Sequence, residues 1–119
     1  MPPRRIESHL PLTPVTFQVL VSLVRGPMHG YGVRRDVEQR TEGRFTLGAG
    51  TLYTRLQRME ESGLIRETGT PEGFEDEASS RWRFYQITGL GEQVLRAEVL
   101  RLESDAAAAR ALLAEAGRT

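Results

Sequence analysis

Apolar residues recur at helical spacing in three segments between residues 13 and 62, and each segment predicts a helix. The first helix begins at Thr13, a favourable N-cap that is followed by proline, and it ends at a Gly-Pro pair. The second helix follows residues 29–32 and runs to about residue 40, with Val33 and Val37 on its inner face. The spacing therefore predicts a compact helical body for the first half of the chain.

The third helix, over residues 48–62, has the most informative pattern. Leu52, Leu56 and Met59 share one face and are expected in the core. The other face carries hydrogen-bond donors that suit a DNA major groove, namely Thr51, Thr54, Arg55 and Arg58. A solvated amphipathic helix shows the same periodicity, so this helix alone leaves both interpretations open.

Two strands and a final helix are expected after Gly63, which is typical of a helix stop. Residues 64–68 and 81–87 are rich in β-branched or aromatic side chains and predict a hairpin. Its long loop, residues 69–80, is acidic and is expected to be mobile. Thr88 then caps a long helix.

The final helix carries a row of apolar residues spaced alternately by four and three, which is a heptad pattern. We call this row the heptad stripe; it consists of Leu95, Val99, Leu102, Ala106, Ala109 and Leu113. A chain of this length leaves little surface to cover it, so we expect a homodimer. The alternative is a helix that folds back on the core of its own chain.

The order of three helices, two strands and a helix is the plan of a winged helix-turn-helix protein, mainly α within an α+β class. We expect a two-stranded wing and a long C-terminal dimerisation helix. The boundaries are an irregular, proline-containing N-terminal arm (1–12), a DNA-binding domain (13–88) and the dimerisation helix (89–119).

Composition narrows the function classes. The net charge is zero, but residues 1–66 hold ten arginines against six acids, whereas residues 67–80 hold five acids and no arginine. There is no cysteine and there are two histidines, so no metal site and no cofactor are expected. No nucleophile–base set or phosphate-binding glycine loop is visible, which argues against an enzyme. Without an apolar span or leader, we expect a cytoplasmic protein that contacts no membrane.

Three motifs in register resemble the PadR family of bacterial transcriptional regulators. They are GPMHGYG (residues 26–32), GTLYTRLQRMEESGLI (residues 50–65) and RFYQITGLG (residues 83–91). The short C-terminus is similar to the subgroup with a single terminal helix. The resemblance implies a homodimer that binds a pseudo-palindromic operator in double-stranded DNA and usually represses transcription.

Some members of this family release DNA when a small aromatic or cationic compound binds at the dimer interface. The resemblance therefore adds a small-molecule effector to the candidate partners. Multidrug-sensing members carry a tryptophan in the last helix that stacks on ligands, and Leu102 stands at that position here. A multidrug pocket is accordingly not expected.

The candidate DNA-binding residues have distinct expected roles. Arg55 is the best candidate for reading a base edge, and Tyr53 is expected to reach a phosphate unless it is a half-buried core residue. Tyr31 either contacts a phosphate or packs in a turn, and His29 is expected to cap a helix. The full set is Tyr31, Thr51, Tyr53, Thr54, Arg55, Arg58, Arg81 and Arg83. The competing function is a winged-helix module that binds another protein and no DNA.

Overall fold

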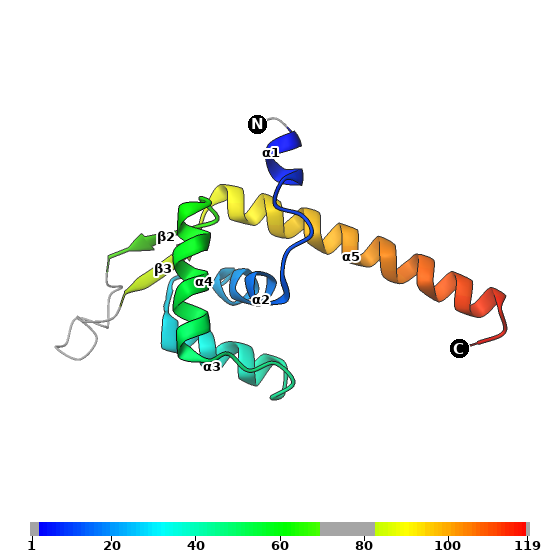
Figure 1. Cartoon of the computed structure of the whole chain (residues 1–119), viewed down its shortest axis with the longest axis horizontal. Coiled ribbons are helices and arrows are strands. Elements are labelled where there is room, and N and C mark those ends of the chain that lie inside the picture. The colour runs from blue at the N-terminus through cyan, green and yellow to red at the C-terminus, as the bar shows by residue number, and fades with distance from the viewer. Residues whose placement is uncertain (1–2, 70–82, 119) are drawn as a thin grey trace.

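The computed structural model describes residues 3–69 and 83–118 and shows a helical body from which one long helix extends (Figure 1). Its elements confirm the predicted mainly-α (α+β) class. They are α1 (Pro3–Glu7), α2 (Pro14–Leu23), β1 (Met28–His29), α3 (Gly30–Arg40), α4 (Ala49–Glu61), β2 (Ile65–Thr68), β3 (Phe84–Ile87) and α5 (Gly89–Glu115).

Three of the four predicted helix starts have side-chain caps, which satisfy backbone donors that the first helical turn leaves free. In each case the cap accepts a hydrogen bond from the backbone N–H three residues later. Thr13 Oγ1 accepts from Thr16 at 3.2 Å, His29 Nδ1 from Gly32 at 3.0 Å, and Thr88 Oγ1 from Gly91 at 3.0 Å.

The core lies where α2, α3 and α4 meet the sheet and the first turns of α5. Leu20 from α2, Val37 from α3 and Leu56 from α4 are completely buried within it. Burial of such side chains supplies most of the driving force for folding. Gly91 lets α5 approach the sheet, because a Cβ at that position would clash with the carbonyl oxygen of Leu64.

The sheet has three antiparallel strands in the order β1-β3-β2, so it contains one strand more than the two-stranded wing that the sequence predicts. In β1, Met28 pairs with Tyr85 and His29 with Phe84. A two-residue strand is too short to show alternation, which explains why the pattern missed it. The predicted second strand begins at residue 84 within the described chain, and the acidic loop lies outside it.

The N-terminal arm contains a helix, which corrects the expectation that residues 1–12 are irregular. The prolines allow α1 because Pro3 stands at its first position, where no backbone donor is needed. The arm packs against the core through the half-buried Ile6 and Leu10. It is also tied to α5, since the Leu12 N–H donates to Glu98 Oε2 at 3.0 Å.

Most of the heptad stripe projects beyond the body on α5 (Figure 1). Leu95 is the exception: it packs within the core and is 8% exposed, so it offers little surface to a partner. Val99, Leu102 and Leu113 are 38%, 41% and 48% exposed. Within the described ranges, no helix combines the length and the apolarity that crossing a membrane requires.

Candidate nucleic-acid interface

Helix α4 presents the polar face that its sequence predicts. Its apolar residues Leu52, Leu56 and Met59 are buried in the core. The side chains of Thr51 and Thr54 are exposed, as is that of Arg58, and Arg55 is half-buried. The four predicted donors are therefore outside the core, but they do not share one environment.

A groove of about 560 Å³ is lined by residues of α4, of β3 and of the start of α3. It brings together three predicted residues from distant parts of the sequence, because Tyr31, Tyr53 and Arg83 all line it. Both of these tyrosines are about half exposed. Their hydroxyls and the Arg83 guanidinium are the types of group that contact a nucleic-acid backbone.

Tyr53 lies directly against the start of α3. A Cβ built on Gly30 would be 3.1 Å from Cε1 and 3.2 Å from the hydroxyl of Tyr53, so the ring occupies the space that another residue at position 30 would need. The absence of a side chain at Gly30 therefore makes room for a ring from the third predicted helix.

His29 is the structural cap that the sequence predicts. Its ring stacks on Tyr31 with centroids 6.3 Å apart and meets Phe84 edge-on at 5.3 Å. Burial lowers the pKa of His29 below its ordinary value of 6.5. The neutral ring is the form that accepts the hydrogen bond of Gly32, so the cap and the burial favour the same state.

Charges of both signs lie in and beside the groove. Arg83 is exposed and lies 3.8 Å from Glu67, an ion pair that contributes little by itself. Burial raises the pKa of Tyr85, which also lines the groove. Glu60 also lines the groove and would repel phosphate there. Arg81 lies outside the described residues.

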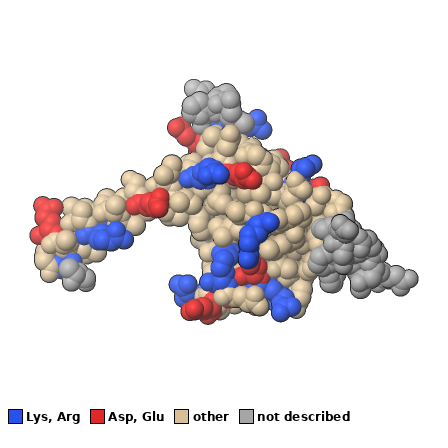
Figure 2. All heavy atoms as spheres, turned by 180° about the vertical axis from the view of Figure 1, so that it is seen from behind, with Lys and Arg blue, Asp and Glu red and all other residues tan. Residues whose placement is uncertain are grey.

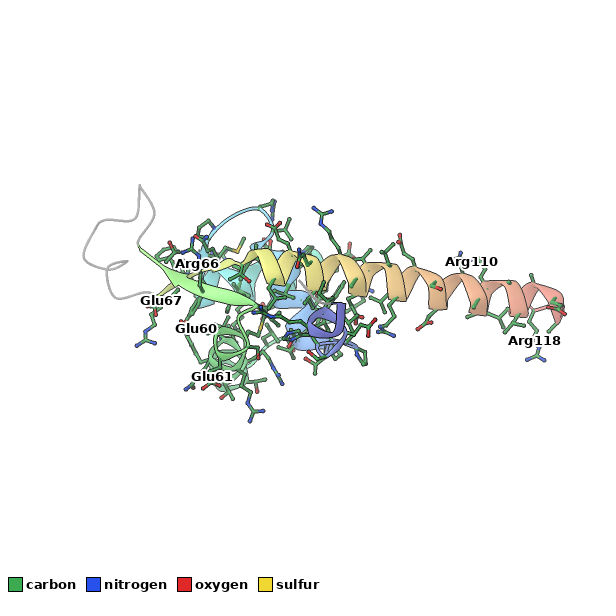
Figure 3. The ribbon with its side chains drawn as sticks, turned by 90° about the horizontal axis from the view of Figure 1, so that it is seen from above. Glu60, Glu61, Arg66, Glu67, Arg110 and Arg118 are labelled. Carbon is green, nitrogen blue, oxygen red and sulfur yellow. The ribbon has the colours of Figure 1, made fainter. Side chains whose placement is uncertain are left out.

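Arg55 and Arg58 do not line this groove. They lie on the other side of α4, around a hollow of about 160 Å³ that is completed by the N-terminal arm. His9 and Thr13 line it together with the two arginines. Seen from above, α1 and α4 lie on the same side of α5 (Figure 3). No short-range pattern could have indicated this neighbourhood, because the arm is about 45 residues away from α4 along the chain.

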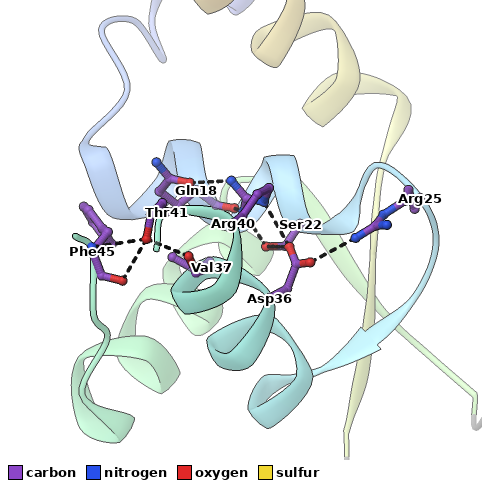
Figure 4. Close-up of polar contacts among 8 residues, drawn as sticks. All are labelled: Gln18, Ser22, Arg25, Asp36, Val37, Arg40, Thr41 and Phe45. Carbon is purple, nitrogen blue, oxygen red and sulfur yellow. Dashed lines mark hydrogen bonds and ion pairs between the residues drawn. The ribbon is translucent and has the colours of Figure 1, made fainter. Parts of the chain in front are cut away.

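The opposite face of the body carries basic and acidic groups next to one another (Figure 2). A polar cluster of the body is centred on Asp36 of α3, which accepts hydrogen bonds from the buried Ser22 and from Arg25 and Arg40 (Figure 4). Burial raises the pKa of Asp36, but the hydrogen bonds from Ser22 and Arg40 outweigh it and lower the pKa below its usual value. This cluster fixes the packing of α3 on α2.

No group of three metal-ligating side chains occurs within residues 3–69 and 83–118. The arrangement at α4 is instead that of a polar surface on a rigid scaffold. Two tyrosines and an arginine lie on one side of the helix, two threonines are exposed on it, and two arginines lie on the other side.

Solved structures share this fold over most of the chain. A PadR family transcription regulator from Clostridium difficile is 22% identical with a TM-score of 0.70, covering 85% of this chain and 99% of that one. A transcriptional regulator from Clostridium thermocellum is 20% identical with a TM-score of 0.67, covering 92% and 95%. Bacillus subtilis PadR, solved in complex with operator DNA, is 20% identical with a TM-score of 0.61, covering 75% and 48%.

Sequence comparisons agree with the structural ones. An uncharacterized 37.1 kDa protein of transposon TN4556 from Streptomyces fradiae is 35% identical over 80 residues, which is 67% of this chain and 20% of that protein. The model of the transcriptional regulator PadR-like family matches residues 19–97, from the middle of α2 to the first turns of α5. Because this match covers most of the chain and all of its predicted motifs, the protein belongs to the PadR-like family of transcriptional regulators.

Proposed function

We propose that this protein is a sequence-specific DNA-binding regulator that represses transcription as a homodimer on a pseudo-palindromic operator. One observation carries the proposal: α4 buries its apolar face and leaves Thr51 and Thr54 exposed beside a groove with two tyrosines. A helix that presents its first turns in this way suits a major groove. The operator complex of Bacillus subtilis PadR, a protein of the same fold, supports it.

The proposed contacts divide between bases and backbone. Thr51 and Thr54 lie in the first two turns of α4, where recognition helices contact base edges. Tyr31 and Tyr53 contact phosphate from the groove. The complete proposed set is Tyr31, Thr51, Tyr53, Thr54, Arg55, Arg58, Arg81 and Arg83. The carboxylates of Glu60 and Glu61 in the last turns of α4 repel the phosphates of DNA. We therefore assign the base contacts to the beginning of the helix.

The proposed dimer forms through α5. Five members of the heptad stripe are exposed: Val99, Leu102, Ala106, Ala109 and Leu113. A pairing of two such helices removes this apolar surface from water, and the two alanines allow close approach. In this arrangement residues 13–88 bind DNA and residues 89–119 hold the two protomers together.

A small-molecule effector is the remaining proposed partner. A hollow of about 540 Å³ lies between the end of α2 and α5, and its lining is mostly apolar. Val24, Val99 and Leu100 contribute to it, together with the charged Glu92 and Arg96. Because it adjoins the heptad stripe, a compound bound there would alter the dimer. We propose no enzymatic activity, and we place the regulator in the cytoplasm with the DNA that it binds.

The proposal is tested by measuring the binding of full-length protein to sheared genomic DNA at two salt concentrations. Phosphate contacts release counterions, so affinity should fall steeply as salt rises, by about tenfold or more between 50 and 200 mM. The competing function, a winged-helix module that binds only protein, predicts no binding at either concentration. The exposed threonines of α4 favour the DNA interpretation, because the buried centre of a protein–protein interface is usually more apolar.

A further inference from the structure

The arginines in the described part of the chain differ in their partners. Five of them are ion-paired, and these are Arg25, Arg34, Arg40, Arg83 and Arg101. Within residues 3–69 and 83–118, Arg55 and Arg58 have neither an ion pair nor a side-chain hydrogen bond, and Arg96, Arg110 and Arg118 share this state. Arg55 and Arg58 lie one turn apart on α4 and line the same hollow.

The hollow that they share is positively charged and rich in hydroxyls. His9 from the arm adds a third nitrogen-bearing side chain, and Thr13, Thr16 and Ser62 also line it. Among the described residues, no acidic side chain does so. Arg55 is half-buried here, and a partly desolvated guanidinium without an anion is unfavourable. The composition and the missing partner both point to an anionic ligand.

The arm is held in place independently of any ligand. Glu98 of α5 is 2% exposed and accepts from the Leu12 N–H at 3.0 Å, while Arg101 donates to both of its carboxylate oxygens at 2.6 and 3.0 Å. Leu12 itself lines the hollow. A buried, fully bonded carboxylate therefore fixes the arm side of the hollow relative to α5.

The geometry of α4 separates Arg55 from the groove that contains Tyr53. Residues on an α-helix follow one another at about 100°, so side chains two positions apart project about 200° apart. Tyr53 accordingly faces β3 and the start of α3, whereas Arg55 faces the arm. A base-reading role for Arg55 would require the side chain to leave its hollow.

We propose that the hollow between the arm and α4 binds a backbone phosphate of DNA, held by Arg55 and Arg58 with His9 beside them. The N-terminal arm is then a third DNA-contacting element, next to α4 and the wing. This inference rests on the proposed function, and it assigns Arg55 to a contact with the DNA backbone instead of a contact with a base. Glu61, exposed one turn after Arg58, lies outside the hollow and weakens the attraction.

The test uses Arg55→Gln and Arg58→Gln in the 119-residue chain, with Arg118→Gln as a control that removes an equal charge beyond the end of α5. Affinity for one duplex, chosen from a randomised pool by the wild-type protein, is measured over a range of salt concentrations. Each α4 variant should bind about tenfold more weakly. The slope of log affinity against log salt should fall by about one for each phosphate contact that a substitution removes. The control should match the wild type.

A second measurement separates phosphate from base contacts. If Arg55 holds a phosphate, the preferred sequence selected by Arg55→Gln should be identical to that of the wild type. A relaxed preference at one base in each half-site would overturn the proposal and restore the base-reading role. Glu61→Gln provides a change of opposite sign and should strengthen binding with an increased salt slope.

A third measurement distinguishes DNA phosphate from free phosphate. Inorganic phosphate is titrated into the protein–DNA complex at constant ionic strength. A site for DNA phosphate should show no displacement at millimolar phosphate, whereas displacement that Arg55→Gln abolishes would identify a free-anion site and contradict the proposal. If the affinity of the wild-type protein for DNA depends steeply on salt but both arginine variants bind as tightly as the wild type, only the proposed phosphate site in the hollow is refuted. If wild-type protein does not bind DNA, the proposed function itself fails.

Discussion

The backbone N–H of Leu12 donates a hydrogen bond to the buried carboxylate of Glu98, although the two residues are 86 positions apart. This contact joins the N-terminal arm to α5, and the ion pair with Arg101 completes the bonding of the carboxylate. The same helix carries the exposed part of the heptad stripe further along its length. The arm, the hollow beside α4 and the proposed dimer helix are therefore connected through one buried acid.

Replacing Glu98 tests this connection. Glu98→Ala leaves the Leu12 N–H without its acceptor and should lower the free energy of unfolding by about 2–3 kcal/mol. Glu98→Gln keeps an acceptor in place and should cost about 1 kcal/mol. Urea unfolding measures both. Equal stability of the wild type and Glu98→Ala would show that the arm is not anchored by this contact.

The pKa of His29 predicts a pH dependence of stability. Burial lowers its pKa in the folded state, so the folded protein binds fewer protons than the unfolded chain near pH 6.5. The stability that comes from His29 is complete above pH 6.5 and is lost as the pH falls toward the folded pKa. His29→Asn retains a capping residue and should flatten this part of the profile in thermal unfolding between about pH 5 and 7. A wild-type profile without a decline in that window would contradict the assignment.

Gly30→Ala should separate DNA binding from folding. The added Cβ would lie 3.1 Å from the Tyr53 ring. The ring must therefore move, whereas the first turn of α3 stays folded. We expect affinity for DNA to fall by about 1 kcal/mol, with unchanged thermal stability, because alanine favours the helix. Gly89→Ala is the matched control, since it also lies at a helix start and nothing is within 4 Å of its added Cβ. It should leave DNA binding intact, and equal losses in the two variants would exclude a specific role for Tyr53.

The heptad stripe is tested by Leu102→Glu, which places a charge in the middle of the proposed helix pair. Burial of an unpaired carboxylate is unfavourable, so the dimer should dissociate at micromolar protein concentration. Ser104→Glu is the control, because residue 104 is also exposed and projects about 200° away from residue 102. Light scattering with size-exclusion chromatography measures the mass. A monomeric wild type, or a dimeric Leu102→Glu variant, would remove α5 as the interface.

Features that depend on short-range patterns were predicted well from the sequence. Thr13, His29 and Thr88 cap helices as expected, and the buried face of α4 follows from its spacing. These features are local, since a cap or an amphipathic face is determined by residues within one or two turns.

Features that depend on long-range packing were missed. The strand β1 is two residues long and exists through its pairing with β3. Leu95 follows the heptad spacing but packs inside its own chain, because the first turns of α5 lie on the core. The sequence predicts DNA contacts for both Arg55 and Tyr53, whereas the packing of the arm and the sheet places them beside different neighbours.

Selection of duplexes from a fully randomised pool by the full-length protein tests the central proposal most directly. A dimer with two copies of α4 should enrich an inverted repeat whose half-sites are about one helical turn apart, roughly 10–10.5 base pairs between centres. Thr54→Ala should change the preferred base at one position in each half-site. A pool that gains no common sequence, or that gains one asymmetric site, would contradict the account of a homodimer reading DNA with α4.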